Sequence, residues 1–404
     1  MSAVVSAVTP AQAAGTTPSV EHVFGYATEQ IMVATEQLWP GDAARLLEHV
    51  PSVTSYVCRI QVGHRSLYAK YSYLGSSLVS VLRGRCGDWN QVRAAQLSYV
   101  RTPGSLLARE AVQLRFLDRL WRPRACRVVG YRLGALFTEP ARGVTLAQML
   151  REDPSRTPEL LECTWQELGG LHSAKVPHRF ARSVAIEERG IAATFARKFP
   201  DQLAVKRHGA GERGEWATLC RVVERLNRLR ATAVEATAWP VLVYGDLKPE
   251  HVAFERDTDR PVFLDPALLP AHVTVDAAKL ISRTVLFLIG SQPDSLARQA
   301  VCDGVAAFVD RRARQVPATA RMQWLRELVT LWLMDTVNIL TTYRCAPAEL
   351  PMPAHAKAVL SRAPAVLTLV DEVSAKLAAG ADPHVACILA LYPIACPAPR
   401  APRP

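Results

Sequence analysis

Apolar side chains recur at helical spacing at the start of the chain and then alternate with polar ones. The spacing over residues 22–50 predicts helices that a Pro-Gly pair interrupts. Residues 53–62 and 66–73 are rich in β-branched and aromatic side chains on either side of a turn signal, which predicts a hairpin. Residues 75–104 are rich in Gly and Arg, and we interpret them as an irregular insertion of unknown use.

The rest of the chain has a mostly helical pattern, with one island of strand character at residues 239–270. Residues 105–120 carry apolar side chains at a helical period, and residues 126–138 predict two short strands. Further helices are expected over residues 146–151, 158–173, 183–199 and 212–234, and from 275 to about 376. The pattern predicts an α+β fold with a small, strand-containing N-terminal lobe and a larger helical C-terminal lobe.

Composition and charge narrow the class of protein. The chain has 404 residues, of which 49% are hydrophobic and 21% charged, and this excludes wholesale disorder, collagen-like repeats and a coiled-coil rod. Its net charge is +11, and residues 51–130 carry 13 Arg and Lys against 3 Asp and Glu. Such a field favours an anionic partner, although a solvated surface also accounts for it. No stacking platform or base-reading motif accompanies the charge, which argues against a nucleic-acid partner.

The cysteines and the apolar runs indicate the cellular compartment of the protein. The nine cysteines are scattered without a Cys-x-x-Cys pair, so neither a zinc site nor a disulfide framework is indicated. The first 20 residues lack the charge and the apolar run of a signal peptide. No window of about 18 residues is apolar enough for a transmembrane helix. We therefore expect a cytoplasmic protein with reduced thiols and no membrane partner.

The strand island contains the polar motif of the chain. Residues 241–254 read VLVYGDLKPEHVAF, and residues 261–266 read PVFLDP. Two apolar strands thus end in Asp246 and Asp265, with a polar hairpin tip at 257–260 between them. If the two strands pair, both carboxylates lie at the same end of one small sheet. Paired carboxylates at strand ends are typical of a magnesium ion and a general base, because hard cations prefer oxygen ligands.

This motif resembles the catalytic and metal-binding loops of the aminoglycoside phosphotransferase and choline kinase-like family, small relatives of the protein kinases. The resemblance implies a two-lobed, protein kinase-like fold with ATP in the cleft between the lobes. It implies that Asp246 is the base for an acceptor hydroxyl and that Asp265 is a ligand of Mg²⁺.

Other positions match the family in the same order along the chain. Lys70, the single lysine in the first 174 residues, corresponds to the lysine that contacts the α- and β-phosphates, and Glu110 to its acidic partner. The resemblance places adenine against the backbone around Glu139. It assigns Asp276, and more weakly His172, structural roles. The hydroxyl residues that would cover the phosphates are Ser52, Thr54 and Ser55.

The motif departs from the family pattern at two positions. Tyr244 stands where the family has a histidine of mainly structural importance. His251 replaces the metal-binding asparagine, and neutral imidazole suits Mn²⁺ and other transition metals better than Mg²⁺. Glu250 is a further candidate ligand beside it.

The expected division is a flexible tail at 1–20, a nucleotide-binding lobe at 21–139, a catalytic and substrate lobe at 140–395 and a tail at 396–404. Three functions stay open. The first is an ATP-dependent kinase for a hydroxyl group of a small molecule such as an antibiotic, a sugar or another metabolite. The second is a Ser/Thr kinase for a peptide in a natural-product pathway, working with a partner protein. The third is a nucleotide-binding pseudokinase or scaffold.

Overall fold

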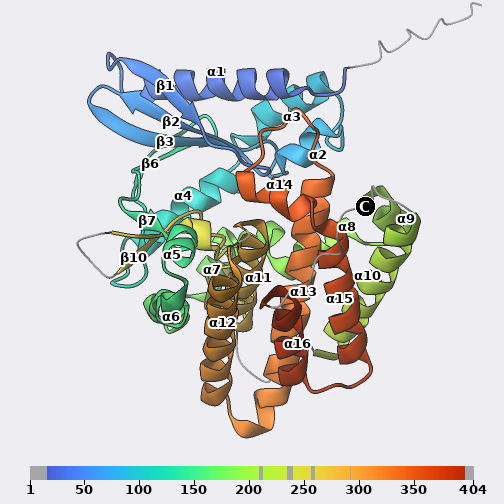
Figure 1. Cartoon of the computed structure of the whole chain (residues 1–404). Helices are drawn as coiled ribbons and strands as arrows, with labels where there is room; N and C mark the ends of the chain where they lie inside the picture. The colour runs from blue at the N-terminus through green and yellow to red at the C-terminus, as the bar shows by residue number, and fades with distance from the viewer. Residues whose placement is uncertain (1–15, 209–212, 234–239, 256–259, 292, 396–404) are drawn as a thin grey trace, which may run out of the picture.

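Five antiparallel strands form the sheet of the N-terminal lobe in a computed structural model (Figure 1), which describes residues 16–208, 213–233, 240–255, 260–291 and 293–395. Their order is β1-β2-β3-β6-β5. Lys70 lies on the central strand β3, where its neighbours across the ladder are Val57 on β2 and Leu136 on β6. The strands are β1 (Ala44–His49), β2 (Tyr56–Val62), β3 (Arg65–Tyr71), β5 (Val128–Arg132) and β6 (Ala135–Thr138).

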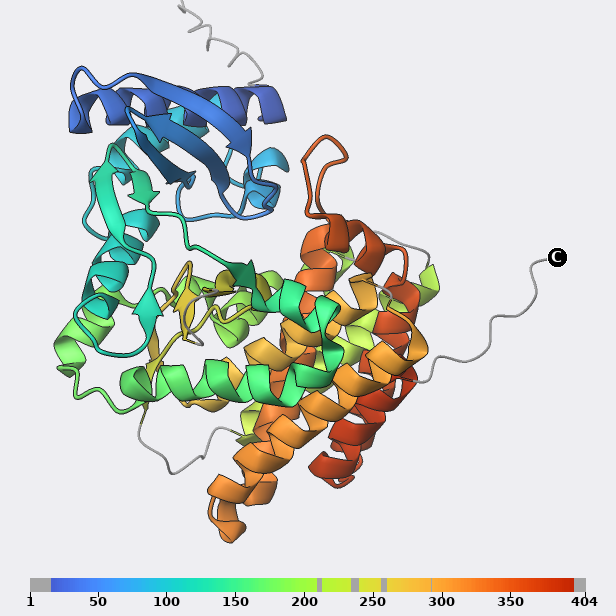
Figure 2. The same cartoon turned by 60° about the vertical axis from the view of Figure 1, so that its left-hand side comes forward.

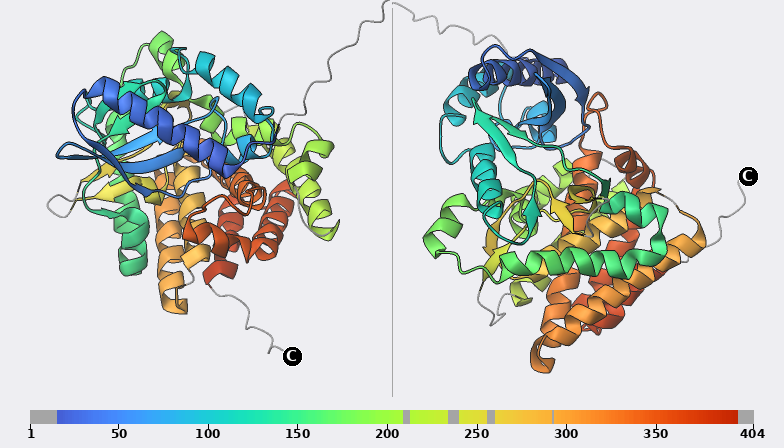
Figure 3. Two further views of the ribbon diagram at one scale, coloured as in Figure 1. Left: turned by 90° about the horizontal axis from the view of Figure 1, so that it is seen from above. Right: turned by 90° about the vertical axis from the view of Figure 1, so that its left-hand side faces the viewer.

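Helix α1 (Val20–Leu38) lies along the sheet (Figures 1 and 3). Ser19 begins the helix, since its side chain accepts a hydrogen bond from the backbone of His22. Val23 and Ile31 point into the lobe's own core, which also contains side chains of β2 and β3. The N-terminal lobe thus has a hydrophobic core apart from that of the helical lobe.

The structure corrects two predictions in this lobe. Residues 44–49 form strand β1 instead of a helix, because pairing with β2 outweighs a helical spacing that spans only a few residues. The segment at 75–104 is not irregular: it holds α2 (Leu78–Leu82) and α3 (Trp89–Tyr99). Asp88 and Gln91 form a capping box at the start of α3, a local signal that the Gly and Arg content masks.

Helix α4 (Leu106–Leu117) stands between the sheet and the helical lobe (Figure 1). Leu107, Ala111 and Leu114 form a small core with Leu136 of the sheet. The lobes have a second link besides α4. The loop that follows α13 rises towards the sheet (Figure 2), and its Leu350 is 3% exposed within the N-terminal core.

The C-terminal lobe consists of helices with two small sheets, of order β4-β10-β9-β7 and β11-β8. Together with the N-terminal sheet, this confirms the predicted two-lobed α+β class. None of the helices in the described ranges is both long and apolar enough to cross a membrane. The helices are α5 (Leu146–Glu152), α6 (Thr157–His172), α7 (His178–Val184), α8 (Ile191–Lys198), α9 (Gln202–His208), α10 (Arg213–Ala233), α11 (Thr274–Ser291), α12 (Ser295–Gln315), α13 (Ala318–Arg344), α14 (Ala354–Leu360), α15 (Ala363–Ala378) and α16 (Pro383–Ala395). The short strands are β4 (Arg124–Ala125), β7 (Val144–Thr145), β8 (Val241–Val243), β9 (Val252–Phe254), β10 (Pro261–Phe263) and β11 (Leu269–Ala271), and the 3₁₀ turns are η1 (Pro154–Arg156), η2 (Glu187–Arg189) and η3 (Pro249–His251).

One prediction about this lobe is also wrong, and one condition that the sequence left open is not met. The expected helix at 183–199 is broken into α7, η2 and α8, because the backbone of Ile186 leaves the helix to donate to Leu268. The strands before Asp246 and Asp265 do not pair with each other: β8 pairs with β11, and β10 pairs with β9 and β4. The expected hairpin tip lies mostly outside the described residues.

Candidate active site

Lys70 is the centre of a buried charge cluster between the lobes. Its Nζ lies 2.8 Å from Glu110 Oε1 on α4 and 3.0 Å from Asp265 Oδ2 after β10. The lysine is 7% exposed, so two carboxylates compensate for the loss of its hydration. Three residues that are far apart in the sequence thus meet at one point.

A 3₁₀ turn of the helical lobe supplies a second cation to this cluster. Arg189 of η2 donates from Nη1 to the other oxygen of Glu110 at 2.9 Å. The residues just before them form another ion pair, Arg109 with Glu188. Burial alone would lower the pKa of Arg189, but nearby carboxylates, Glu110 first, raise it. Two adjacent residues of α4 therefore form ion pairs with two adjacent residues of η2 across the lobe boundary.

Gln113, one turn further along α4, strengthens this connection. Its side-chain oxygen accepts from the backbone N–H of Leu268 at 2.8 Å, and its amide nitrogen donates to the Leu268 carbonyl at 3.0 Å. The same nitrogen donates to the Val184 carbonyl at 2.6 Å. These bonds hold α4 against the loop that follows Asp265.

Asp246 lies at the end of β8, in a turn that requires glycine at its first position. Gly245 has φ of +79°, and a Cβ there would lie 2.1 Å from the carbonyl oxygen of Ala267. The carboxylate of Asp246 is 2.7 Å from Lys248 Nζ and 3.3 Å from Lys279 Nζ. Burial alone would raise the pKa of Asp246, but Lys248 and Lys279 hold it well below its usual range. The carboxylate is therefore ionised.

Asp276 fixes the backbone of this turn. It is fully buried at the start of α11 and accepts the backbone N–H groups of Tyr244 at 2.8 Å and Gly245 at 2.7 Å. His172 Nε2 lies 3.0 Å from the same carboxylate. The hydroxyl of Tyr244 donates to the Leu264 carbonyl at 2.7 Å, which links the turn to the residue before Asp265. These contacts position the site and leave no free group on Asp276 for chemistry.

Helix α11 also carries cations along the face that borders Asp246. Lys279 and Arg283, one turn apart, both pair with Asp335 of α13, at 3.0 Å and 2.7 Å. All three side chains are buried. Lys279 is thereby shared between Asp246 and Asp335, which fixes its ammonium beside the carboxylate of Asp246.

Asp265 has an unusual backbone and a partly accessible side chain. Its φ is +53°, in the left-handed region that Asp tolerates better than most residues. Burial alone would raise the pKa of Asp265, but Lys70, His251 and Arg189 lower it, so this carboxylate is ionised too. Its side chain is 36% exposed, which leaves it within reach of a ligand.

His251 lies next to Asp265, with Nε2 3.9 Å from Oδ2. Burial lowers the pKa of His251 to about 4, so the imidazole is neutral. Its Nδ1 is buried and has no hydrogen-bond partner among the residues that the structure describes. A carboxylate with a neutral, incompletely bonded imidazole is a donor set that suits a divalent cation.

Glu250 is surrounded by positive charge. Burial alone would raise its pKa, but His251, Lys248 and His355 lower it. Over the described ranges, no three His, Cys, Asp or Glu side chains are grouped to hold a metal ion by themselves. A cation here would need ligands from a bound molecule besides Asp265 and His251.

The remaining predicted residues make other contacts than those of the Lys70 cluster. Ser52 accepts from the backbone of Thr54 at 3.2 Å, and the carbonyl of Thr54 accepts from Leu78 at the start of α2 at 3.2 Å. Ser55 is buried. Glu139 follows β6 and pairs with Arg127 at 3.4 Å. No hydrogen bond or ion pair joins these four predicted residues to the cluster within the described chain.

Arg189, Lys248 and Lys279 are site residues that the sequence analysis did not select. Lys248 is part of the motif, and lysine is rare in this chain, so three of its eight lysines (Lys70, Lys248 and Lys279) lie in one site. That rarity is a signal for the two lysines. Arg189 is one of 40 arginines and has no comparable signal.

Comparison with solved structures finds distant similarity to small-molecule kinases. The chain is similar to a choline kinase from Cryptosporidium parvum Iowa II, with a TM-score of 0.48 and 11% identity over 89% of this chain and 99% of the other. A choline kinase from Streptococcus pneumoniae has a TM-score of 0.45 and 13% identity, over 86% of this chain and 99% of the other. An ADP-bound aminoglycoside phosphotransferase has a TM-score of 0.43 and 13% identity, over 84% of this chain and 97% of the other. No protein-family model and no curated protein matches the chain.

Proposed function

We propose that this chain is an ATP-dependent phosphotransferase that moves the γ-phosphoryl group to a hydroxyl group of a small molecule. The observation that supports this most is the buried cluster in which Lys70 bridges Glu110 and Asp265. Beside it lies an ionised Asp246 between two lysines. The cluster offers a cation for phosphates and two carboxylates with different surroundings.

Lys70 is the residue that would contact the α- and β-phosphates. Its ammonium is a compact point charge, and Glu110 fixes its position from α4. Arg189 holds the other oxygen of Glu110, so the carboxylate keeps its orientation when Lys70 turns towards a phosphate. Glu110 and Arg189 act as positioning residues in this scheme.

Asp246 would take the proton of the acceptor hydroxyl. The hydroxyl oxygen forms a bond to the γ-phosphorus, and the bond from that phosphorus to the β,γ-bridging oxygen breaks. ADP leaves with the electron pair, and the hydroxyl proton passes to the Asp246 carboxylate. Lys248 and Lys279 keep this carboxylate ionised and contribute positive charge beside the transferring group.

Asp265 and His251 are the residues that would hold a divalent cation, because His251 Nε2 lies 3.9 Å from Asp265 Oδ2 and the Asp265 side chain is 36% exposed. When bound, Mg²⁺ or Mn²⁺ neutralises charge on the phosphates. The imidazole favours Mn²⁺ over Mg²⁺. Glu250 interacts mainly with cations, which makes it a weaker candidate for this role.

Release of ADP tests the proposal. Wild-type protein with ATP and Mg²⁺ or Mn²⁺ is assayed against a panel of sugars, other hydroxyl metabolites and Ser- or Thr-containing peptides. We expect a productive acceptor, and a fall of about a thousandfold in turnover for Asp246→Asn, since loss of a general base costs that order. Asp303→Asn on α12 is the matched control, because this exposed side chain accepts a hydrogen bond from Gln299 of its own helix.

Equal turnover of Asp246→Asn and wild type would contradict the proposal. Nucleotide binding without transfer to any acceptor would favour the scaffold alternative. Turnover confined to peptides would favour the peptide kinase.

A further inference from the structure

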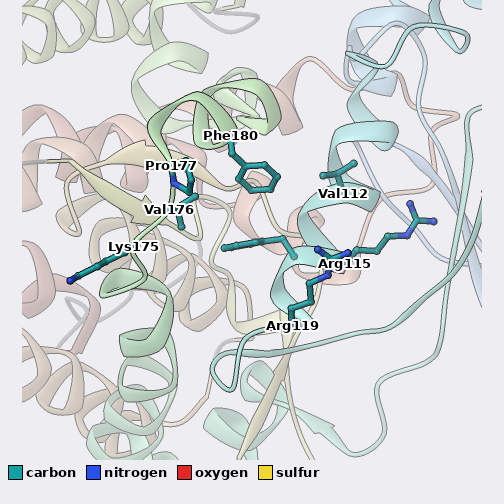
Figure 4. A pocket seen from close by; sticks show the side chains of 8 residues that line it. Val112, Arg115, Arg119, Lys175, Val176, Pro177 and Phe180 are labelled. Atoms are coloured by element: carbon teal, nitrogen blue, oxygen red, sulfur yellow. The ribbon is translucent and has the colours of Figure 1, made fainter.

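A groove that none of the Lys70 cluster residues lines lies between α4 and the segment that leads into α7 (Figure 4). We call it the α4 groove and define it by Val112, Phe116 and Phe180 on its floor and by Arg115, Arg119 and Lys175 around it. Its volume is about 470 Å³. That is room for a few bulky side chains.

The floor of the α4 groove is apolar and accessible. The rings of Phe116 and Phe180 lie 5.4 Å apart and are tilted by 47°. Val112, one turn before Phe116, is 39% exposed, which is high for a large aliphatic side chain on a helix. Exposed apolar side chains that gather in a concave place indicate a binding surface more than scattered ones do.

The surrounding cations outnumber the nearby acids, of which Asp118 at the end of α4 is one. Arg115, Arg119 and Lys175 are exposed, and none of them forms an ion pair or hydrogen bond within the described part of the chain. Neighbouring arginines are paired: Arg109 with Glu188, and Arg122 with Glu167 at 3.7 Å. Residues 174–183 contain no Asp or Glu. The groove is therefore a local excess of positive charge around an apolar centre.

We propose that the α4 groove binds an acidic peptide segment of a partner protein. Its bulky apolar side chains would lie on Phe116 and Phe180, and its carboxylates would pair with Arg115, Arg119 and Lys175. The cations at the edge of the groove are exposed, so an extended peptide segment can cross the groove and continue into solvent at both ends. The apolar floor offers nothing to a phosphate backbone.

Occupation of the groove would act on α4, the helix that carries Glu110. Val112 and Glu110 lie within one turn, and Gln113 fixes the same turn to the helical lobe. A bound segment would stabilise the orientation of α4 in which Glu110 reaches Lys70. This coupling rests on the proposed function, whereas binding to the groove does not.

Fluorescence anisotropy tests the binding directly. The probe is a short fluorescein-labelled peptide in which Asp and Glu alternate with Phe and Leu, and the comparison peptide has Asn and Gln in place of the acids. We expect the acidic probe to bind at least about tenfold tighter than the comparison peptide. Added salt should weaken its binding. The double variant Arg115→Glu with Arg119→Glu should lose about tenfold or more in affinity.

Two further variants separate charge from packing. Phe180→Ala should weaken both peptides, because it removes part of the apolar floor. Arg314→Glu, a single charge reversal at an exposed position of α12, should leave the affinity unchanged, whereas Arg115→Glu alone should lower it. Hydrogen exchange should slow at residues 112–119 and 175–180 when the acidic probe is bound.

Equal affinity for the two peptides, or for wild type and the double variant, would overturn the proposal. So would failure of the acidic probe to bind wild-type protein. Retention on phosphatidylserine–phosphatidylcholine vesicles that Arg115→Glu with Arg119→Glu abolishes, without peptide binding, would assign the groove to a lipid surface instead. None of these readouts depends on phosphoryl transfer, so they fail independently of the proposed function.

Discussion

His251 departs from the asparagine of the family that the motif resembles, and its imidazole lies beside Asp265. If it is a metal ligand, its chemistry sets the preferred cation. His251→Asn replaces a nitrogen donor by an amide oxygen, so we expect the ratio of Mg²⁺-supported to Mn²⁺-supported ADP release to rise severalfold. His64→Asn in the exposed turn before β3 is the control. An unchanged ratio would mean that His251 is not a ligand.

Lys198 is a partly buried lysine outside the site. It ends α8, and its ammonium donates to the carbonyl of Asn338 and to the hydroxyls of Thr341 and Thr342 on α13. Burial lowers the pKa of Lys198 to about 7, from an ordinary value of 10.5. Below pH 7 both the folded and the unfolded state carry the charge, and burying it weakens the fold.

Between these two pKa values the unfolded chain binds a proton that the folded chain does not. The free energy of unfolding should therefore rise with pH, by at most about 1.4 kcal/mol per unit. We predict that the difference in unfolding free energy between wild type and Lys198→Met shifts in favour of wild type from about pH 7 to pH 9. Urea unfolding at several pH values measures it, and a difference independent of pH would refute the lowered pKa.

At the scale of elements, the contact between α4 and η2 joins the lobes through two neighbouring ion pairs. The pair of Arg109 and Glu188 is mostly buried, so Arg109→Glu alone should lower the unfolding free energy by about 2 kcal/mol. Adding Glu188→Arg should restore most of it, because the charges are complementary again. Urea unfolding of the single and double variants measures the coupling.

The exposed pair of Arg65 and Asp42, 3.0 Å apart, provides the matched control for this cycle. The variant Arg65→Asp with Asp42→Arg should differ from wild type in unfolding free energy by no more than about 0.5 kcal/mol. If the two cycles give the same coupling, the α4–η2 contact is no stronger than a surface ion pair.

The elements also mark the limit of the sequence analysis. Long periodic segments such as α4 and α10 were predictable, because many positions repeat the same signal. Strand β1 was not, since its identity depends on pairing with β2. The break before η2 depends on a backbone bond from Ile186 to Leu268, some 80 positions away, and no local pattern encodes it.

The candidate site was likewise predictable where a local sequence signal exists and not where only tertiary contacts bring residues together. Lys70, Glu110, Asp246 and Asp265 were selected from a motif and from the rarity of lysine. Asp246 and Asp265 were expected to share one sheet end only if their strands paired, which they do not. Lys70 instead joins Asp265 to Glu110, the partner that the resemblance implied. Arg189 reaches the cluster only through the tertiary fold.

At the scale of the whole molecule, the loop after α13 connects the lobes a second time through Leu350. Leu350→Ala should remove about 2–4 kcal/mol of packing from the N-terminal core and loosen the cleft. We expect a lower melting temperature and a raised KM for ATP. Leu296→Ala, at a position 82% exposed, should change neither. A lower melting temperature with an unchanged KM would limit Leu350 to a structural role.

The left-handed backbone of Asp265 determines which replacements the position can accept. Only glycine, asparagine and aspartate adopt this conformation at little cost, so bulky or β-branched side chains there would distort the loop as well as remove the carboxylate. Asp265→Asn keeps both shape and backbone and removes only the charge. In a library randomised at this codon, selection for folding alone should therefore retain all three residues, and selection for activity should retain aspartate.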